Sequence, residues 1–144
     1  MNRETTDVEL DTWGKAHIPG FSGVVARNEL DRIWPTMQRM PPGSSAVVNL
    51  DYGYRRGGSH WVAVRVAKEA PVVLYVDSFG MPPAREVVLK ARKEGRGILW
   101  SDVMRQSTPE VNCGPRALAA LAYLAKNASA GKEIESFGRV AQVV

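Results

Sequence analysis

The stretch HWVAVRVAKEAPVVLYVD, residues 60–77, decides the fold expected for this chain. It holds two runs rich in β-branched and aromatic residues, 60–67 and 71–77, which are typical of strands. Only a few polar residues separate them, and the second run opens with Pro71. A connection of this length predicts a β-hairpin.

The hairpin brings an imidazole close to a carboxylate. If residue 67 lies opposite residue 71, then His60 and Asp77 meet at the open mouth of the hairpin, within one residue of register. Neighbouring strands lie about 4.8 Å apart, so the carboxylate can orient the ring, fix its tautomer and stabilise its charged form. A plain salt bridge at a hairpin end has the same appearance, and the pairing alone does not separate the two interpretations.

The remaining apolar patterns predict an α+β fold, with a small mixed sheet packed against helices. Further strands are predicted over 45–51 and 97–101, each rich in β-branched or aromatic residues. Helices are predicted over 7–17, with Asp7 as its cap, over 83–95 and over 113–127, with a weaker helix in 131–144. The stretch 18–30 is expected to be an irregular connector.

Length and composition fit a globular protein. A chain of 144 residues is long enough for one domain with its own core, so residues 1–144 are expected to form a single domain. No apolar run reaches the ~20 residues of a membrane span, and the N-terminus lacks the pattern of a signal peptide. An intracellular protein without membrane contact is therefore expected.

Cys113 is the only cysteine, which excludes an internal disulfide and a cysteine-rich zinc site. It lies at the predicted start of an amphipathic helix, where free N–H groups and the helix dipole favour a thiolate nucleophile. Gly114 leaves room for a substrate to approach the backbone, and Gln106 supplies a neutral amide suited to an oxyanion hole. A buried cysteine and a surface glutamine remain the alternatives.

The order His60-Trp61, Asp77-Ser78-Phe79-Gly80, Gln106 and Cys113-Gly114 resembles the adenovirus-type cysteine proteases. These share a fold and a site with the SUMO- and ubiquitin-like-protein proteases. The resemblance covers most of residues 10–126 and favours the viral branch.

The resemblance implies a role for each matching residue. His60 would be the general base, Asp77 its orienting carboxylate, Cys113 the nucleophile and Gln106 the oxyanion-hole amide. Trp61, lining the mouth of the site, would contribute with Gly114 to substrate binding. The substrates would be viral structural precursors cut after small, glycine-rich sites, either in the host nucleus or cytoplasm or inside the virion.

The chain also departs from the adenovirus pattern. Activation there uses a peptide attached through a disulfide, but here the one thiol is the expected nucleophile. A peptide or DNA activator would therefore bind non-covalently, and the sequence requires no cofactor and no metal. His17 has no spacing to Cys113 that suggests catalysis and is expected to be structural.

Three alternatives to the maturation protease remain. A deSUMOylase or deubiquitinase of the same fold would cleave a ubiquitin-like tail, and a related bacterial group uses a similar residue order for acetyl transfer. A non-catalytic interaction module is the third.

The net charge of +4 permits a polyanion partner. Cations near His60 and on and just after the predicted helix 83–95 form a candidate surface for sequence-independent DNA binding, with a solvated face as the alternative. These cations are Arg55, Arg56, Lys90, Arg92, Lys93 and Arg96.

Overall fold

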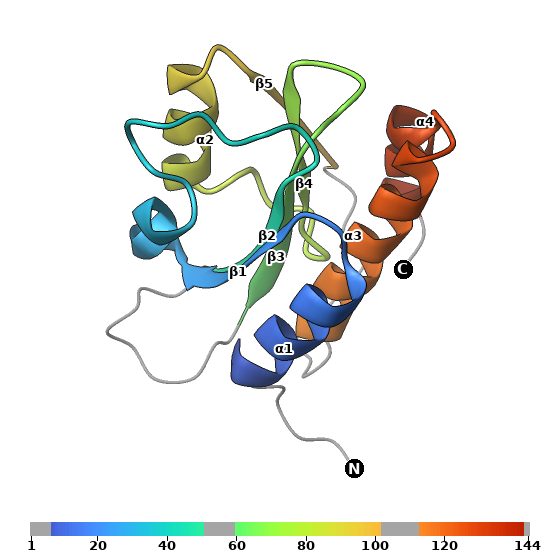
Figure 1. Ribbon diagram of the computed structural model, residues 1–144, viewed down its shortest axis with the longest axis horizontal. Coiled ribbons are helices and arrows are strands. Elements are labelled where there is room, and N and C mark those ends of the chain that lie inside the picture. The colour runs from blue at the N-terminus through green and yellow to red at the C-terminus, as the bar shows by residue number, and fades with distance from the viewer. Residues whose placement is uncertain (1–6, 51–59, 102–112, 143–144) are drawn as a thin grey trace.

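The computed structural model describes residues 7–50, 60–101 and 113–142, and it contains a five-stranded mixed sheet with helices on both faces (Figure 1). The strands lie side by side in chain order: β1 (Phe21–Ala26), β2 (Ser45–Asn49), β3 (Trp61–Val66), β4 (Val72–Val76) and β5 (Gly97–Trp100). The helices are α1 (Asp7–His17), the 3-10 helix η1 (Arg27–Arg32), α2 (Arg85–Lys93), α3 (Cys113–Ala128) and α4 (Glu133–Gln142).

The sheet is antiparallel at its centre and parallel at its two edges. β3 pairs antiparallel with both β2 and β4, which confirms the predicted hairpin. β1 runs parallel to β2, and β4 runs parallel to β5. Parallel neighbours need a crossover connection, and η1 and α2 lie in these two crossovers.

Helices cover both faces of β3, so every one of its residues is buried. Val62 and Val64 belong to the core beneath α2 and η1, whereas Trp61 and Ala63 belong to the core beneath α1 and α3. Successive side chains of a strand point to opposite faces, which explains this alternation. A strand covered on both sides is rich in apolar residues, and β3 is apolar except for Arg65.

The prediction of an irregular connector at 18–30 is wrong, because this stretch contains β1 and most of η1. Gly23 interrupts the apolar pattern, with φ of 138° at the point where the register with β2 shifts. Residues with a side chain rarely adopt this conformation, so the glycine permits a bulge within a genuine strand. The predicted helices at 7–17, 83–95 and 113–127 are confirmed with small changes of bounds.

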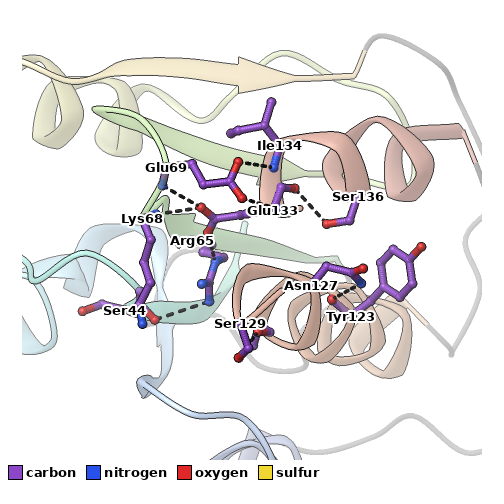
Figure 2. A network of polar contacts seen from close by, with 12 residues as sticks. Ser44, Arg65, Lys68, Glu69, Tyr123, Asn127, Ser129, Glu133, Ile134 and Ser136 are labelled. Atoms are coloured by element: carbon purple, nitrogen blue, oxygen red, sulfur yellow. Dashed lines mark hydrogen bonds and ion pairs between the residues drawn. The ribbon is translucent and has the colours of Figure 1, made fainter. Parts of the chain in front are cut away.

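A buried ion pair and the hydrogen bonds around it connect α4 to β3 and to the turn between β3 and β4 (Figure 2). Arg65 Nε lies 2.5 Å from Glu133 Oε2, and both side chains are buried. The other oxygen of Glu133 accepts the backbone N–H groups of Lys68 and Glu69, at 2.7 and 3.0 Å. The Glu69 carboxylate in turn accepts the N–H groups of Glu133 and Ile134 at the start of α4. Glu133 thus accepts hydrogen bonds from backbone N–H groups of the β3–β4 turn, and Glu69 accepts them from the first N–H groups of α4, which have no partner within the helix.

Within the described ranges, no helix combines the length and the apolar character needed to cross a membrane.

The buried pair is expected to be a large contributor to stability. Replacing Arg65 with Met leaves the Glu133 carboxylate buried without its cation, so the free energy of unfolding should fall by about 3–5 kcal/mol. Urea unfolding followed by circular dichroism measures the change. The control is Arg139→Ala on α4, which removes an exposed ion pair with Glu135 and should cost much less stability than the loss of the buried pair. Equal losses for the two variants would contradict the expectation.

Candidate active site

His60 and Asp77 lie at the same end of the β3–β4 hairpin and form a hydrogen bond. The distance from His60 Nε2 to Asp77 Oδ1 is 2.6 Å. His60 directly precedes β3, and Asp77 directly follows β4. The predicted meeting of these two side chains is therefore found in the structure.

The register that produces this meeting differs by one residue from the predicted one. Val66 pairs with Val73, and the backbone bond from Ala67 N to Val72 O continues the ladder, so Pro71 belongs to the turn. Proline has no N–H to donate to a ladder. The observed register places Asp77 across from Val62, and hence on the same face as His60. The predicted register would have placed Asp77 across from Trp61, on the opposite face.

A tight turn holds the Asp77 carboxylate in place. Its Oδ1 accepts the N–H of Phe79 at 2.8 Å, and its backbone oxygen accepts the N–H of Gly80 at 2.9 Å. Gly80 has φ of 67°, a left-handed conformation that glycine adopts without strain. Aspartate at the first position and glycine at the fourth are favoured in such turns. The sequence DSFG therefore fixes the carboxylate before any ligand binds.

Phe79 is a site residue for which the sequence reasoning gave no separate role. Its ring packs on the His60 imidazole, with centroids 4.3 Å apart and planes inclined by 35°. Contact on this face, together with the bond to Asp77, restricts rotation of the imidazole. The side chain of Asp77 is 1% exposed and that of His60 is 13% exposed, so the pair is largely shielded from water. The Asp-x-x-Gly turn signature is the signal that could have placed Phe79 here.

Tyr75 anchors the far end of the segment that follows Asp77. Its hydroxyl oxygen accepts the N–H of Ala84 at 3.2 Å. Burial raises the pKa of Tyr75 well above its usual range, although the Ala84 hydrogen bond opposes that shift. The hydroxyl therefore stays neutral, and the segment 77–84 is tied to β4 at both ends.

The start of α3 packs closely against the start of β3. Gly114 is buried, and a Cβ atom at this position would lie 3.0 Å from Leu10 and 3.4 Å from Trp61. Because Trp61 follows His60 and Gly114 follows Cys113, this contact brings the two chain segments of the candidate site together. The Cys113 backbone begins α3, as predicted. The Cys113 side chain and Gln106 lie outside the described part of the chain.

Two predicted substrate-binding residues have packing roles instead. Trp61 is 5% exposed and lies in the core with Leu10 and Leu121, so it does not line the mouth of a channel. A large indole between sheet and helices stabilises the fold by removing its apolar surface from water. Gly114 lacks a side chain because Leu10 and Trp61 occupy the space. Contact of either residue with a substrate stays a prediction.

Arg96 is also not part of an exposed basic surface. It is 6% exposed, and its guanidinium lies 2.5 Å from Glu94 and donates to the Met40 carbonyl at 2.7 Å. Burial lowers the pKa of Arg96, and the neighbouring Glu94 carboxylate opposes that shift. The charge of Arg96 is compensated within the fold, which does not support the predicted contact with DNA.

The other cations predicted to contact DNA differ in their exposure and in their ion pairs. Lys90 forms an ion pair with Asp31, so its charge is already compensated. Arg92 and Lys93 are exposed on α2, whereas Arg55 and Arg56 lie outside the described residues.

His17 lies at the end of α1 and stacks on Trp13, with ring centroids 4.3 Å apart. Its Nδ1 lies 2.9 Å from the Trp13 carbonyl oxygen. In the part of the chain that is described, no cluster of three or more His, Cys, Asp or Glu side chains has the arrangement of a metal site.

The fold is that of a protease already known in structure. The chain is similar to the ASFV pS273R protease, whose crystal structure matches with a TM-score of 0.59 at 16% sequence identity. The match covers 96% of this chain but 66% of that one, so the chain spans slightly less than two thirds of its length. No protein-family model and no curated protein matches the sequence. At this level of identity, the likeness shows a shared fold.

Close packing at Gly114 leads to a prediction about stability. The Gly114→Val substitution places a branched side chain against Leu10 and Trp61, so the free energy of unfolding should fall by about 1–3 kcal/mol. The matched control is Gly138→Val in α4, where a Cβ meets no atom within 4 Å. Thermal unfolding of the two variants measures the difference, and a Gly114→Val protein as stable as the control would show that the contact is loose.

Proposed function

We propose that this protein is a cysteine endopeptidase that uses Cys113, His60 and Asp77. The observation that supports it best is the 2.6 Å hydrogen bond between His60 and Asp77, at the open end of the β3–β4 hairpin. This end of the hairpin lies beside the helix that begins at Cys113, in a fold similar to that of a known protease. A carboxylate that binds one ring nitrogen fixes the tautomer and leaves the other nitrogen as the base. Here Asp77 binds Nε2, so proton exchange with the thiol takes place at Nδ1.

The proposed reaction follows from these roles. His60 Nδ1 takes the proton of the Cys113 thiol, and the thiolate attacks the peptide carbonyl carbon. The developing oxyanion accepts hydrogen bonds from the Gln106 amide and from the Cys113 backbone N–H. The protonated His60 then donates its proton to the leaving amine, and the C–N bond breaks to give a thioester. Water, deprotonated by His60, hydrolyses the thioester and restores the thiol.

We propose polypeptide substrates, specifically viral structural precursors cut after small residues such as glycine. The viral assignment is supported by the similarity to the ASFV protease and by the residue order of the site. Trp61 is buried, so a narrowed channel cannot be attributed to its indole. Peptides with Gly-Gly before the cut, compared with Leu-Leu peptides, test the preference in reducing buffer without an activator.

Loss of the nucleophile or of the base should remove cleavage. Cys113→Ala and His60→Ala should each lower kcat/KM almost to the uncatalysed level, because members of a catalytic triad act as a unit. The control is His17→Ala, which removes the only other histidine and should retain full activity. Circular dichroism checks that each variant is folded. Retained turnover by purified Cys113→Ala would exclude the cysteine protease mechanism.

The supporting residues should have smaller and distinct effects. Asp77→Asn keeps a hydrogen-bonding group beside His60 but favours the wrong tautomer, so its rate should fall less than that of His60→Ala. Gln106→Ala should lower kcat on the order of 10²-fold, as expected for loss of one oxyanion donor. Steady-state kinetics on one peptide substrate measures both. A Gln106→Ala protein with wild-type kcat would remove Gln106 from the proposed site.

A further inference from the structure

A hollow of about 250 Å³ opens between the segment that follows η1 and the last turn of α2. It lies far from the His60–Asp77 pair. The chain leaves the α2 side of the hollow and enters β5 at Gly97, which pairs with Val72 at the start of β4. Asp77 follows the opposite end of β4. The lining residues are Pro35, Thr36, Met37, Gln38, Arg39, Lys90, Lys93 and Glu94.

Residues 35–39 form one wall of the hollow, and the Glu94 carboxylate binds the residues at both ends of this segment. Glu94 Oε2 accepts the indole N–H of Trp34 at 2.8 Å and the backbone N–H of Met40 at 3.1 Å. Arg96 reinforces this arrangement, because it pairs with Glu94 and donates to the Met40 carbonyl. The shape of the hollow is therefore set before any ligand binds, which lowers the ordering cost of binding.

The hollow carries positive charge that the fold does not neutralise. Glu94 is engaged by Arg96, and Lys90 is engaged by Asp31. The hydrogen bond from Lys90 lowers the pKa of the Asp31 carboxyl, which keeps that pair charged. Arg39 and Lys93 are both exposed, and no carboxylate in the described ranges pairs with either of them. These two cations are the groups available to a ligand.

An exposed apolar side chain also lines the hollow. Met37 is 93% exposed and lines the hollow, and Leu89, which is also exposed, lies one turn before Lys93 on the same side of α2. Methionine and arginine are enriched where proteins bind other proteins. Nucleic-acid interfaces, in contrast, are much more strongly positive.

We propose that this hollow binds an acidic segment of another polypeptide, with carboxylates on Arg39 and Lys93 and an apolar side chain against Met37. Most of its lining residues are exposed, so it suits an extended chain that passes across the surface. Because the hollow and the His60–Asp77 pair lie at opposite ends of the sheet, this binding does not depend on the proposed protease activity.

Direct binding tests the proposal. A short fluorescein-labelled peptide of alternating Glu and Leu is titrated with the full chain carrying Cys113→Ala, which prevents cleavage, and fluorescence anisotropy is recorded. A peptide with Gln in place of Glu should bind about tenfold more weakly. Lys93→Glu and Arg39→Glu should each weaken binding of the acidic peptide by about tenfold as well. Arg92→Glu is the matched control, because it makes the same charge change on α2 outside the hollow.

The control separates a site from general attraction of charges. Arg92→Glu should weaken binding by less than about twofold, because surface charges that make no direct contact are screened. An equal loss in Arg92→Glu and Lys93→Glu, or no saturable binding of the acidic peptide, would overturn the proposal. Duplex DNA serves as a second probe: DNA binding that Lys93→Glu removes, without binding of the acidic peptide, would assign the hollow to nucleic acid instead.

Discussion

The antiparallel register between β3 and β4 is the constraint on which the candidate site depends. Side chains on a strand alternate between faces, so a slip of one residue would move Asp77 to the face opposite His60. The turn between Ala67 and Val72 sets the register, and Glu133 of α4 accepts two of the backbone donors in that turn. The buried contact with α4 at one end of the hairpin thus helps to fix the geometry of the His60–Asp77 pair at the other.

The second requirement is a close approach between the sheet and α3. Helices cover both faces of the sheet, with η1 and α2 on one side and α1, α3 and α4 on the other (Figure 1). Gly114 lets the first turn of α3 approach Trp61, directly beside His60. Trp61 therefore supports this region from within the core, and the preceding residue, His60, holds the bond to Asp77. Because side chains alternate along a strand, the two neighbours point to opposite faces of the sheet.

The two ends of the sheet have different physical character. At one end, a shielded carboxylate is bonded to an imidazole whose rotation is restricted. At the other, Glu94 and Arg96 use their charges to hold a surface hollow in shape, and Arg39 and Lys93 remain exposed on its rim. The proposed catalysis and the proposed binding of an acidic segment therefore involve separate sets of residues.

The sequence by itself determined the features that depend on local patterns. Runs of β-branched and aromatic residues joined by a short connection predicted the hairpin, and helical periodicity predicted the main helices. The hairpin in turn predicted the approach of His60 to Asp77. Tertiary structure decided the rest. β1 became a strand because β2 pairs with it across the Gly23 bulge, and Trp61 and Arg96 became buried because helices and a loop cover them. The contact of Phe79 with His60 required the true register. Burial and register depend on residues distant in sequence, and a local pattern does not contain that information.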